Sequence, residues 1–281
     1  MKNKLKIGLS VLLAVLTVAG SVGLLVWQNH SHLRLTEGKL QLHFIDVGQG
    51  DAALLILPTG ERIMIDTGTE ESGEAILAHL AKWNVKALDL VILSHNHDDH
   101  AGGLSVLAEA LTIGGVLYAG EAPSKCALSM REVVAGDSFS IGEVHFFVLG
   151  PLTKEGTENR SMILRVEYGK RSFLFTGDAE AGEEELLLHT VPQLLDVDLL
   201  KVAHHGSATS STEPFLSAVS PEIAVISASD DNSFGHPTID TLDRLKSQNC
   251  AVYRTDQSGT VIFLCDGKHL SRYRARFLGV E

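Results

Sequence analysis

The chain repeats one pattern of strands and a helix, and the two copies are offset by 109 residues without a gap. The offset carries Gly60 onto Gly169 at a turn and His95 onto His204 at the end of an apolar run. Further matches are Arg62 with Arg171, Thr67-Gly68 with Thr176-Gly177, Gly73 with Gly182, Glu74 with Glu183, and Asp89-Leu90 with Asp198-Leu199. Duplication, or convergence to one supersecondary unit, would produce such a match. We therefore expect two sheets packed face to face with helices outside, and a site on the shared edge where both strands end.

The elements of the first half follow from apolar periodicity. Apolar runs at residues 40–46, 52–57 and 62–66 are separated by turns that contain glycine, and they predict a meander of three strands. Helical spacing follows over residues 74–83. An apolar strand over residues 88–93 then leads directly to His95.

Four metal-binding side chains lie within one turn of chain after that strand. His95, His97, Asp99 and His100 form the pattern H-x-H-x-D-H. Zinc, manganese and iron accept imidazole and carboxylate donors, and such ions activate water as a nucleophile near neutral pH. A solvated polar loop is the alternative, but the apolar strand before the motif and the apolar helix after it argue against that. The motif therefore predicts a metal-dependent hydrolase.

Asp178 follows the second Thr-Gly dipeptide, at the end of another apolar strand. One interpretation is an N-cap for a helix that begins near Glu180, a position that aspartate fills well. The other is a metal ligand, because a carboxylate can bridge two cations. Its place beside the H-x-H-x-D-H motif and His204 favours the ligand.

A second histidine pair, His204-His205, ends the apolar run over residues 197–203. Adjacent strand residues point to opposite faces, so one of the two is expected to bind metal unless the strand has already ended. The match with His95 selects His204, which leaves His205 to contact substrate or to protonate a leaving group. The hydroxyl of Ser207, with those of Thr209 and Ser210, either contacts phosphate oxygens or caps the loop, which is the commoner role.

His236 lies in the segment Phe234-Gly235-His236-Pro237, just before a helix expected over residues 238–245. A residue that precedes proline is extended, and its side chain tends to project from the loop. We expect His236 either to contact substrate or to serve as a turn residue at the start of that helix.

The composition limits the partners of the chain. Its net charge of -12 is unfavourable for indiscriminate binding of nucleic acid, because that mode of binding depends on Lys and Arg neutralising phosphates. Any contact with nucleic acid is therefore expected to be local or to pass through a metal ion. Cys126, Cys250 and Cys265 have no C-x-x-C spacing, so neither a disulfide framework nor a cysteine zinc site is indicated.

The N-terminal residues 1–28 differ in kind from the rest. Lys2, Lys4 and Lys6 precede an apolar stretch from Ile7 to Trp27, about the ~20 residues that span a bilayer as a helix. Lysines before the apolar stretch predict a cytoplasmic N-terminus and an extracytoplasmic remainder. We favour a retained signal anchor over cleavage, which would give a secreted protein. A polar linker over residues 29–38 and one continuous domain over residues 39–281 follow.

Taken together, these segments resemble the metallo-β-lactamase superfamily, and within it the hydrolase domain of the ComEC/Rec2 competence family. The matching segments are residues 44–52, 65–68, 94–103, 175–179, 201–207 and 235–237, in the same order. The resemblance implies an αββα sandwich of two mixed sheets flanked by helices, and one or two divalent ions, zinc or manganese. It also implies that His95 and His97 hold the first metal, that Asp99, His100 and His204 hold the second, and that Asp178 bridges them.

The sequence departs from the family in two respects. Many superfamily members place a further histidine of the first metal site where this chain reads Glu158-Asn159-Arg160-Ser161, and the competence branch tends to have asparagine there. Asn159 is therefore expected to complete the site weakly or to contact substrate. The competence proteins also carry a many-helix channel, whereas this chain has a single apolar span and cannot itself form the pore.

The expected function is a membrane-anchored, extracytoplasmic phosphodiesterase or nuclease, with DNA as a candidate substrate. Asp99 and Asp178 are expected to orient the attacking water and receive its protons. The alternatives are hydrolysis of cell-wall phosphoesters, such as phosphorylcholine or teichoic-acid substituents, and a non-enzymatic metal-binding scaffold. We expect no nucleotide cofactor, and the sequence identifies no protein partner.

Overall fold

The computed structural model describes residues 17, 20, 36–123, 128–152 and 160–273. The chain divides into two compact units, Met1–Glu37 and Gly38–Glu281, and the elements below all belong to the second unit. The segment 1–28 expected to anchor the chain lies outside the described residues, apart from residues 17 and 20. Of the helices within the described ranges, none combines the length and the apolar character needed to cross a membrane.

Two large mixed sheets form the centre of the second unit. The strands of the first sheet are β1 Leu40–Phe44, β2 Ala53–Ile56, β3 Arg62–Ile65, β5 Leu90–Leu93, β7 Val116–Tyr118, β8 Met130–Glu132, β16 Val261–Cys265 and β17 Leu270–Tyr273. They lie in the order β17-β16-β1-β2-β3-β5-β7-β8. The strands of the second sheet are β9 Ser138–Ile141, β10 Val144–Gly150, β11 Ile163–Tyr168, β12 Arg171–Phe175, β13 Leu199–Lys201, β14 Ile223–Ile226 and β15 Ala251–Arg254, in the order β15-β14-β13-β12-β11-β10-β9. A small parallel pair joins β4 Ala87–Leu88 to β6 Thr112–Ile113.

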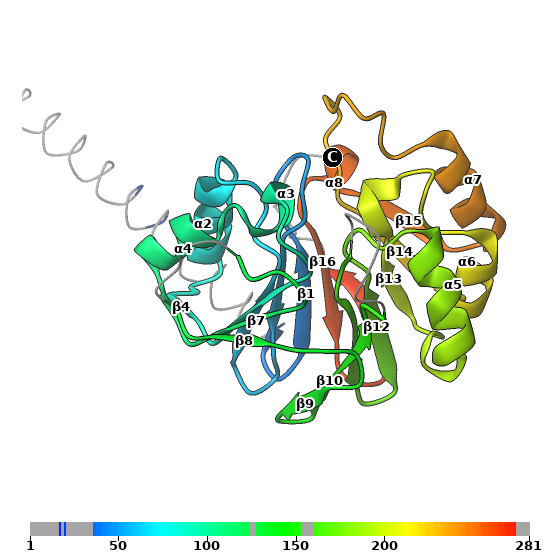
Figure 1. The fold of residues 1–281 in the computed structure, drawn as a ribbon. Coiled ribbons are helices and arrows are strands. Elements are labelled where there is room, and N and C mark those ends of the chain that lie inside the picture. The colour runs from blue at the N-terminus through cyan, green and yellow to red at the C-terminus, as the bar shows by residue number, and fades with distance from the viewer. Residues whose placement is uncertain (1–16, 18–19, 21–35, 124–127, 153–159, 274–281) are drawn as a thin grey trace, which may run out of the picture. The chain divides into compact units, whose positions relative to one another are not determined.

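Helices cover the outer face of each large sheet (Figure 1). The α-helices are α2 Gly73–Lys82, α3 Asp98–Ala101, α4 Leu104–Ala110, α5 Ala181–Thr190, α6 Glu213–Val219, α7 Ile239–Ser247 and α8 Thr255–Ser258. Two 3₁₀ helices are η1 Pro192–Leu194 and η2 Ala203–Gly206. Helices α2 and α4 lie outside the first sheet, whereas α5, α6 and α7 lie outside the second.

The hydrophobic core has three layers that follow this arrangement. The central layer lies between the sheets, where Phe44 of β1 stacks on Phe175 of β12 at 5.9 Å between ring centroids. A second layer packs the other face of the second sheet against α5, α6 and α7, and a third packs the first sheet against α2 and α4. Each sheet is thus apolar on both faces, as strands buried on both sides must be. The expected αββα sandwich of mixed sheets is confirmed.

The repeat seen in the sequence corresponds to a repeated structural unit. In the first half, the β2–β3 hairpin is followed by α2 and then by β5, which is parallel to β3. In the second half, the β11–β12 hairpin is followed by α5 and then by β13, which is parallel to β12. The register differs by one residue between the halves. Ile63 is paired with Leu90, but Leu199 is paired with Phe173, one residue beyond the partner that the constant offset gives. The sequence offset therefore cannot fix side-chain positions beyond these strands.

Candidate metal centre

The H-x-H-x-D-H loop is fixed by the backbone around it. It follows β5, and His97 precedes the short helix α3, which carries Asp99 and His100. The carbonyl of His100 accepts from the Thr67 N–H at 2.6 Å, and the carbonyl of Asp99 accepts from the Asp51 N–H at 3.0 Å. A Cβ atom on Gly50 would lie 2.7 Å from the Asp99 carbonyl oxygen, so this close approach requires glycine.

Three groups of donor side chains form at this edge; one contains Asp51, Asp66 and His100, and Asp178 belongs to the other two. Of these two, the first contains His95, His97 and Asp178; the second contains Asp99, His100, Asp178 and His205, with the donor atoms of each group within 4.8 Å of one another. The His100 Nε2 atom lies 3.1 Å from Asp178 Oδ1, and the His95 Nε2 atom lies 3.8 Å from Asp178 Oδ2. The N-cap alternative for Asp178 is wrong, because the residue at the N-cap of α5 is Glu180.

The geometry corrects the expected choice between His204 and His205. His205 is the member of the second group, with its Nε2 atom 3.1 Å from Asp99 Oδ2 and 3.8 Å from Asp178 Oδ1. Strand β13 ends at Lys201, and both histidines have left-handed backbone angles, with φ of 50° and 53°. Strand alternation therefore does not apply to them, and it cannot select His204. The His204 side chain remains 23% exposed beside Asp178, at 3.8 Å from Nε2 to Oδ2, whereas His205 is buried.

The donor atoms fit divalent metal ions. His95 Nε2, His100 Nε2 and Asp178 Oδ1 are buried, and their contacts among the described residues are with other members of the two groups. Buried polar atoms are costly unless they are paired or bind a metal. Buried donor atoms that lie this close together are what metal ligands require, and imidazole with carboxylate suits zinc or manganese. His95, His97 and Asp178 would hold one ion, and Asp99, His100, His205 and Asp178 would hold a second.

Polar residues behind the ligands hold the imidazole rings in place. Asp66 accepts from the Ser94 N–H at 2.6 Å and the Ser94 hydroxyl at 2.8 Å, and it lies 2.9 Å from His100 Nδ1. The Ser161 hydroxyl accepts from the Asp178 N–H at 2.8 Å and lies 3.1 Å from His95 Nδ1. Such contacts fix the tautomer that leaves Nε2 free for a metal.

A buried ion pair lies behind His205. The Lys201 ammonium is 2.7 Å from Asp51 Oδ1, and both side chains are nearly inaccessible, at 4% and 6% exposed. Asp51 Oδ1 is also 3.5 Å from His205 Nδ1, which lies 3.1 Å from the Ser227 carbonyl. The pair therefore connects the loop after β1 to strand β13 and supports His205 from behind.

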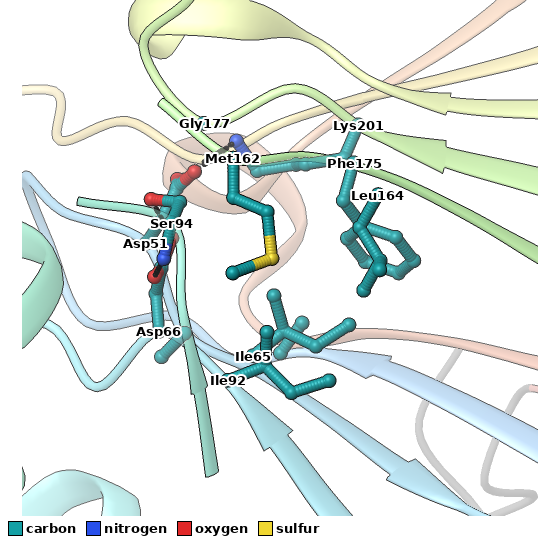
Figure 2. Close-up of a pocket in the computed structure, with 12 residues that line it drawn as sticks. Asp51, Ile65, Asp66, Ile92, Ser94, Met162, Leu164, Phe175, Gly177 and Lys201 are labelled. Carbon is teal, nitrogen blue, oxygen red and sulfur yellow. Dashed lines mark hydrogen bonds and ion pairs between the residues drawn. The ribbon is translucent and has the colours of Figure 1, made fainter. Parts of the chain in front are cut away.

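A small cavity lies between the sheets beneath this centre (Figure 2). Asp51, Asp66 and Ser94 line one side, and Met162 and Phe175 are among the apolar side chains that line the other. Its volume of about 10 Å³ is close to the minimum for one water molecule. It is far too small to admit a substrate.

The charges of the centre are arranged as coupled acid–base pairs. Burial opposes ionisation of His100, but the Asp178 and Asp66 carboxylates outweigh it and raise the His100 pKa well above its usual value. Burial also opposes ionisation of His205, whose pKa the hydrogen bonds with Asp51 and Asp99 nevertheless raise to about 9. Burial lowers the pKa of His95 to about 3. The carboxylates around His100 and His205 therefore favour the protonated forms of these two imidazoles.

The other residues expected to contact substrate have different surroundings. Ser207 is buried, and its hydroxyl lies 3.0 Å from the Thr209 hydroxyl and accepts from the Thr209 N–H, which is the loop-capping alternative. His205 lies among the candidate ligands and not at the surface. His236 is half-buried, with its ring 5.5 Å from that of His204. Asn159 lies outside the described residues.

Four polar residues of the centre were missed as site residues. These are Asp51, Asp66, Ser94 and Ser161. Asp66 carries a usable signal, because it ends an apolar strand beside a Thr-Gly dipeptide as Asp178 does. Asp51 and Ser161 carry no such signal, since their partners lie far away in the sequence. Ser94 lies beside the H-x-H-x-D-H motif, but a single serine at the end of a strand does not indicate a site.

Comparison with known proteins identifies the fold and the relatives of the chain. A family model described as "Metallo-beta-lactamase superfamily" matches residues 45–230. The solved structure of the metallo-beta-lactamase fold protein YhfI from Bacillus subtilis superposes with a TM-score of 0.55 and 11% sequence identity, over 80% of this chain and 99% of that one. At this identity the likeness concerns the fold alone.

Two curated relatives are much closer in sequence. The chain is 33% identical over 259 residues to Recombination protein 2 of Haemophilus influenzae, covering 87% of this chain and 31% of that protein. It is 31% identical over 257 residues to ComE operon protein 3 of Bacillus subtilis, covering 80% and 33%. The chain thus spans about a third of the length of these relatives.

Proposed function

Because the chain belongs to the metallo-β-lactamase superfamily and is related to competence proteins, we propose that it is a metal-dependent phosphodiesterase that acts on DNA. The observation that carries the proposal is the pair of donor groups that share Asp178. Centres with two metals that share a ligand suit in-line displacement at phosphorus, because both the attacking and the leaving oxygen can be stabilised.

The side chains of the centre have two roles in the proposed reaction: some would hold the metal ions, and others would orient the attacking water or transfer protons. Bound ions would supply Lewis-acid polarisation of the phosphoryl oxygen and activation of the attacking water. Both carboxylates would hold metal, but Asp178 is almost fully buried, whereas the Asp99 side chain is 31% exposed and can also face a bound water. Asp99 therefore orients the water and accepts its proton as the water oxygen bonds to phosphorus and the ester P–O bond breaks. The leaving oxygen takes a proton from solvent or from His204, which is the more exposed of the two adjacent histidines.

Bound metal ions would also offset the electrostatic repulsion between this acidic chain and a negatively charged substrate. With a net charge of -12, the chain as a whole repels a polyanion. Bound cations reverse the sign of the potential at the point where a phosphate must lie. An acidic protein can therefore bind a phosphodiester locally without a general affinity for nucleic acid.

The same proposal places the enzyme at the outer face of the cytoplasmic membrane. Three lysines followed by the apolar stretch from Ile7 to Trp27 support a single-pass anchor with the catalytic domain outside. Protease protection in spheroplasts tests this orientation. Degradation of the domain by external protease is expected, and complete protection would contradict it.

The activity is tested with the full chain, depleted of metal and reconstituted with manganese or zinc. Substrates are single- and double-stranded DNA and a small phosphodiester. We expect metal-dependent cleavage that His97→Ala and Asp178→Asn abolish, whereas His269→Ala, at an exposed histidine outside the centre, retains it. Bound metal without hydrolysis of any substrate would refute the proposal. Hydrolysis of the small diester but not of DNA would favour a wall phosphoester as the substrate.

A further inference from the structure

Exposed apolar side chains gather beside the metal centre. Within the described ranges three large hydrophobic side chains are exposed; of these, Phe234, at 69%, lies in the connection from β14 to α7, and Ile239, at 75%, is the first residue of α7. This connection protrudes at the same edge of the domain as α3 (Figure 1). An exposed aromatic ring at the same edge as the metal centre is available to contact a ligand that reaches the centre.

The loop that carries Phe234 is held in place by hydrogen bonds. The Asn232 side-chain amide donates to the carbonyls of Ser229 and His236, and its oxygen accepts from the His236 N–H at 2.9 Å. The Thr238 N–H donates to the Gly206 carbonyl at 3.0 Å, which ties the loop to the segment after His205. The exposure of Phe234 is therefore a property of an ordered loop, and the ring is presented in advance of binding.

A row of rings leads from Phe234 to the candidate ligands. Phe234 stacks on His236 with 5.8 Å between ring centroids and an interplanar angle of 25°. His236 in turn contacts His204 edge-to-face at 5.5 Å, and His204 Nε2 is 3.8 Å from Asp178 Oδ2. The Nδ1 atoms of His204 and His236 are buried and have no hydrogen-bond partner among the described residues, although Glu180 Oε1 lies 3.6 Å from His204 Nδ1. Polar imidazoles thus separate the metal centre from an exposed aromatic face.

We infer that Phe234 is a stacking platform for a base of single-stranded nucleic acid whose neighbouring phosphodiester lies at the metal centre. The inference rests on the proposed function and specifies the form of its substrate. His204 and His236 would contact the phosphate between the stacked base and the scissile bond. Every base has a π face, so stacking binds single strands without sequence readout and without added positive charge, which suits this acidic chain. Bases in a duplex are already stacked on one another, so the duplex is the poorer substrate.

The test compares two single-stranded oligonucleotides of equal length, one with normal bases and one in which abasic sites replace them. The metal-loaded full chain is assayed with Phe234→Ala and Phe234→Trp, and with Val134→Ala as a control at an exposed aliphatic residue elsewhere. Phe234→Ala is expected to lower kcat/KM on the normal strand roughly 5- to 150-fold through KM, the range for loss of one stacked base. It should leave the abasic strand unaffected, and Phe234→Trp should retain the wild-type rate on both. Anisotropy of the labelled strands should report the same loss as weaker binding.

The possible failures are distinct. Equal effects of Phe234→Ala on both strands, or no effect on either, would overturn the platform while cleavage by the wild type upheld the phosphodiesterase. No cleavage of either strand by the metal-loaded wild type would overturn both. Because Phe234 is mostly exposed, the alanine variant should keep the wild-type melting temperature, and the comparison therefore reports on substrate binding.

Discussion

Replacing Lys201 with methionine should destabilise the metal-free fold by about 3 kcal/mol, at the lower end of the range for breaking a buried ion pair. The Lys201 and Asp51 side chains are 4% and 6% exposed and 2.7 Å apart, so the carboxylate left behind cannot be solvated without opening the core. His205 lies 3.5 Å from the same carboxylate and offsets part of the loss. Asp51→Asn should cost more, about 4–5 kcal/mol, because the buried Lys201 ammonium would keep only neutral acceptors, the introduced amide oxygen and the Val202 carbonyl at 3.1 Å.

The assay is urea unfolding followed by circular dichroism at pH 7 with EDTA, since bound metal would add its own stabilisation of the folded state. The double variant Asp51→Asn/Lys201→Met removes both charges, and its cost should fall short of the sum of the single costs by about 1–3 kcal/mol. His269→Gln, at an exposed pair with Asp266, should leave the midpoint unchanged. Single costs below about 1 kcal/mol, or strict additivity in the double variant, would refute the view that this pair is a buried, coupled unit.

Three further predictions concern individual side chains. His205→Gln should lower the metal content of the chain, whereas His204→Gln should retain metal and lose activity. Metal analysis and the phosphodiesterase assay check both variants. Equal loss of metal in the two variants would contradict the assignment of His205, and not His204, as the ligand. Asp66→Asn should weaken metal affinity roughly 10- to 100-fold through its contact with His100, and competition with a chelator measures this. Burial lowers the pKa of His79 to about 4. Its stabilising contribution is therefore complete above pH 6.5 and should be lost as the pH falls towards 4, so urea midpoints of wild type and His79→Gln should converge over that interval.

The fold could be predicted because its pattern is local. Apolar runs, turns and helical spacing marked both halves of the repeat, and the end of strand β5 placed His95 at an edge. The H-x-H-x-D-H ligands lie within six residues, so their proximity follows from the sequence alone. Asp178 could be predicted as a ligand for a similar reason, since it also ends a buried strand.

The supporting residues could not be predicted, because their contacts are formed by the tertiary structure. Asp51 and Lys201 are 150 residues apart and meet where the two sheets pack together. Ser161, in the segment just before β11 of the second hairpin, contacts His95, which is 66 residues away in the sequence. No spacing rule connects such pairs, and only the packing of one sheet on the other brings them into contact.

The backbone conformation of the His204-His205 dipeptide places one histidine ring among the candidate metal ligands and the other on the side of His236. Two consecutive residues with positive φ are costly outside glycine, of order 1–3 kcal/mol each, and such strain persists where surrounding contacts enforce it. Here the left-handed residues follow the end of β13 and separate the two rings: His205 turns inward to Asp99 and Asp51, while His204 turns towards His236. In the proposed mechanism the inward ring belongs to the metal centre and the outward ring to the substrate path that ends at Phe234. A strand continued through residues 204 and 205 would point their side chains to opposite faces, so in the proposed mechanism the irregular backbone is what allows both rings to serve the same edge.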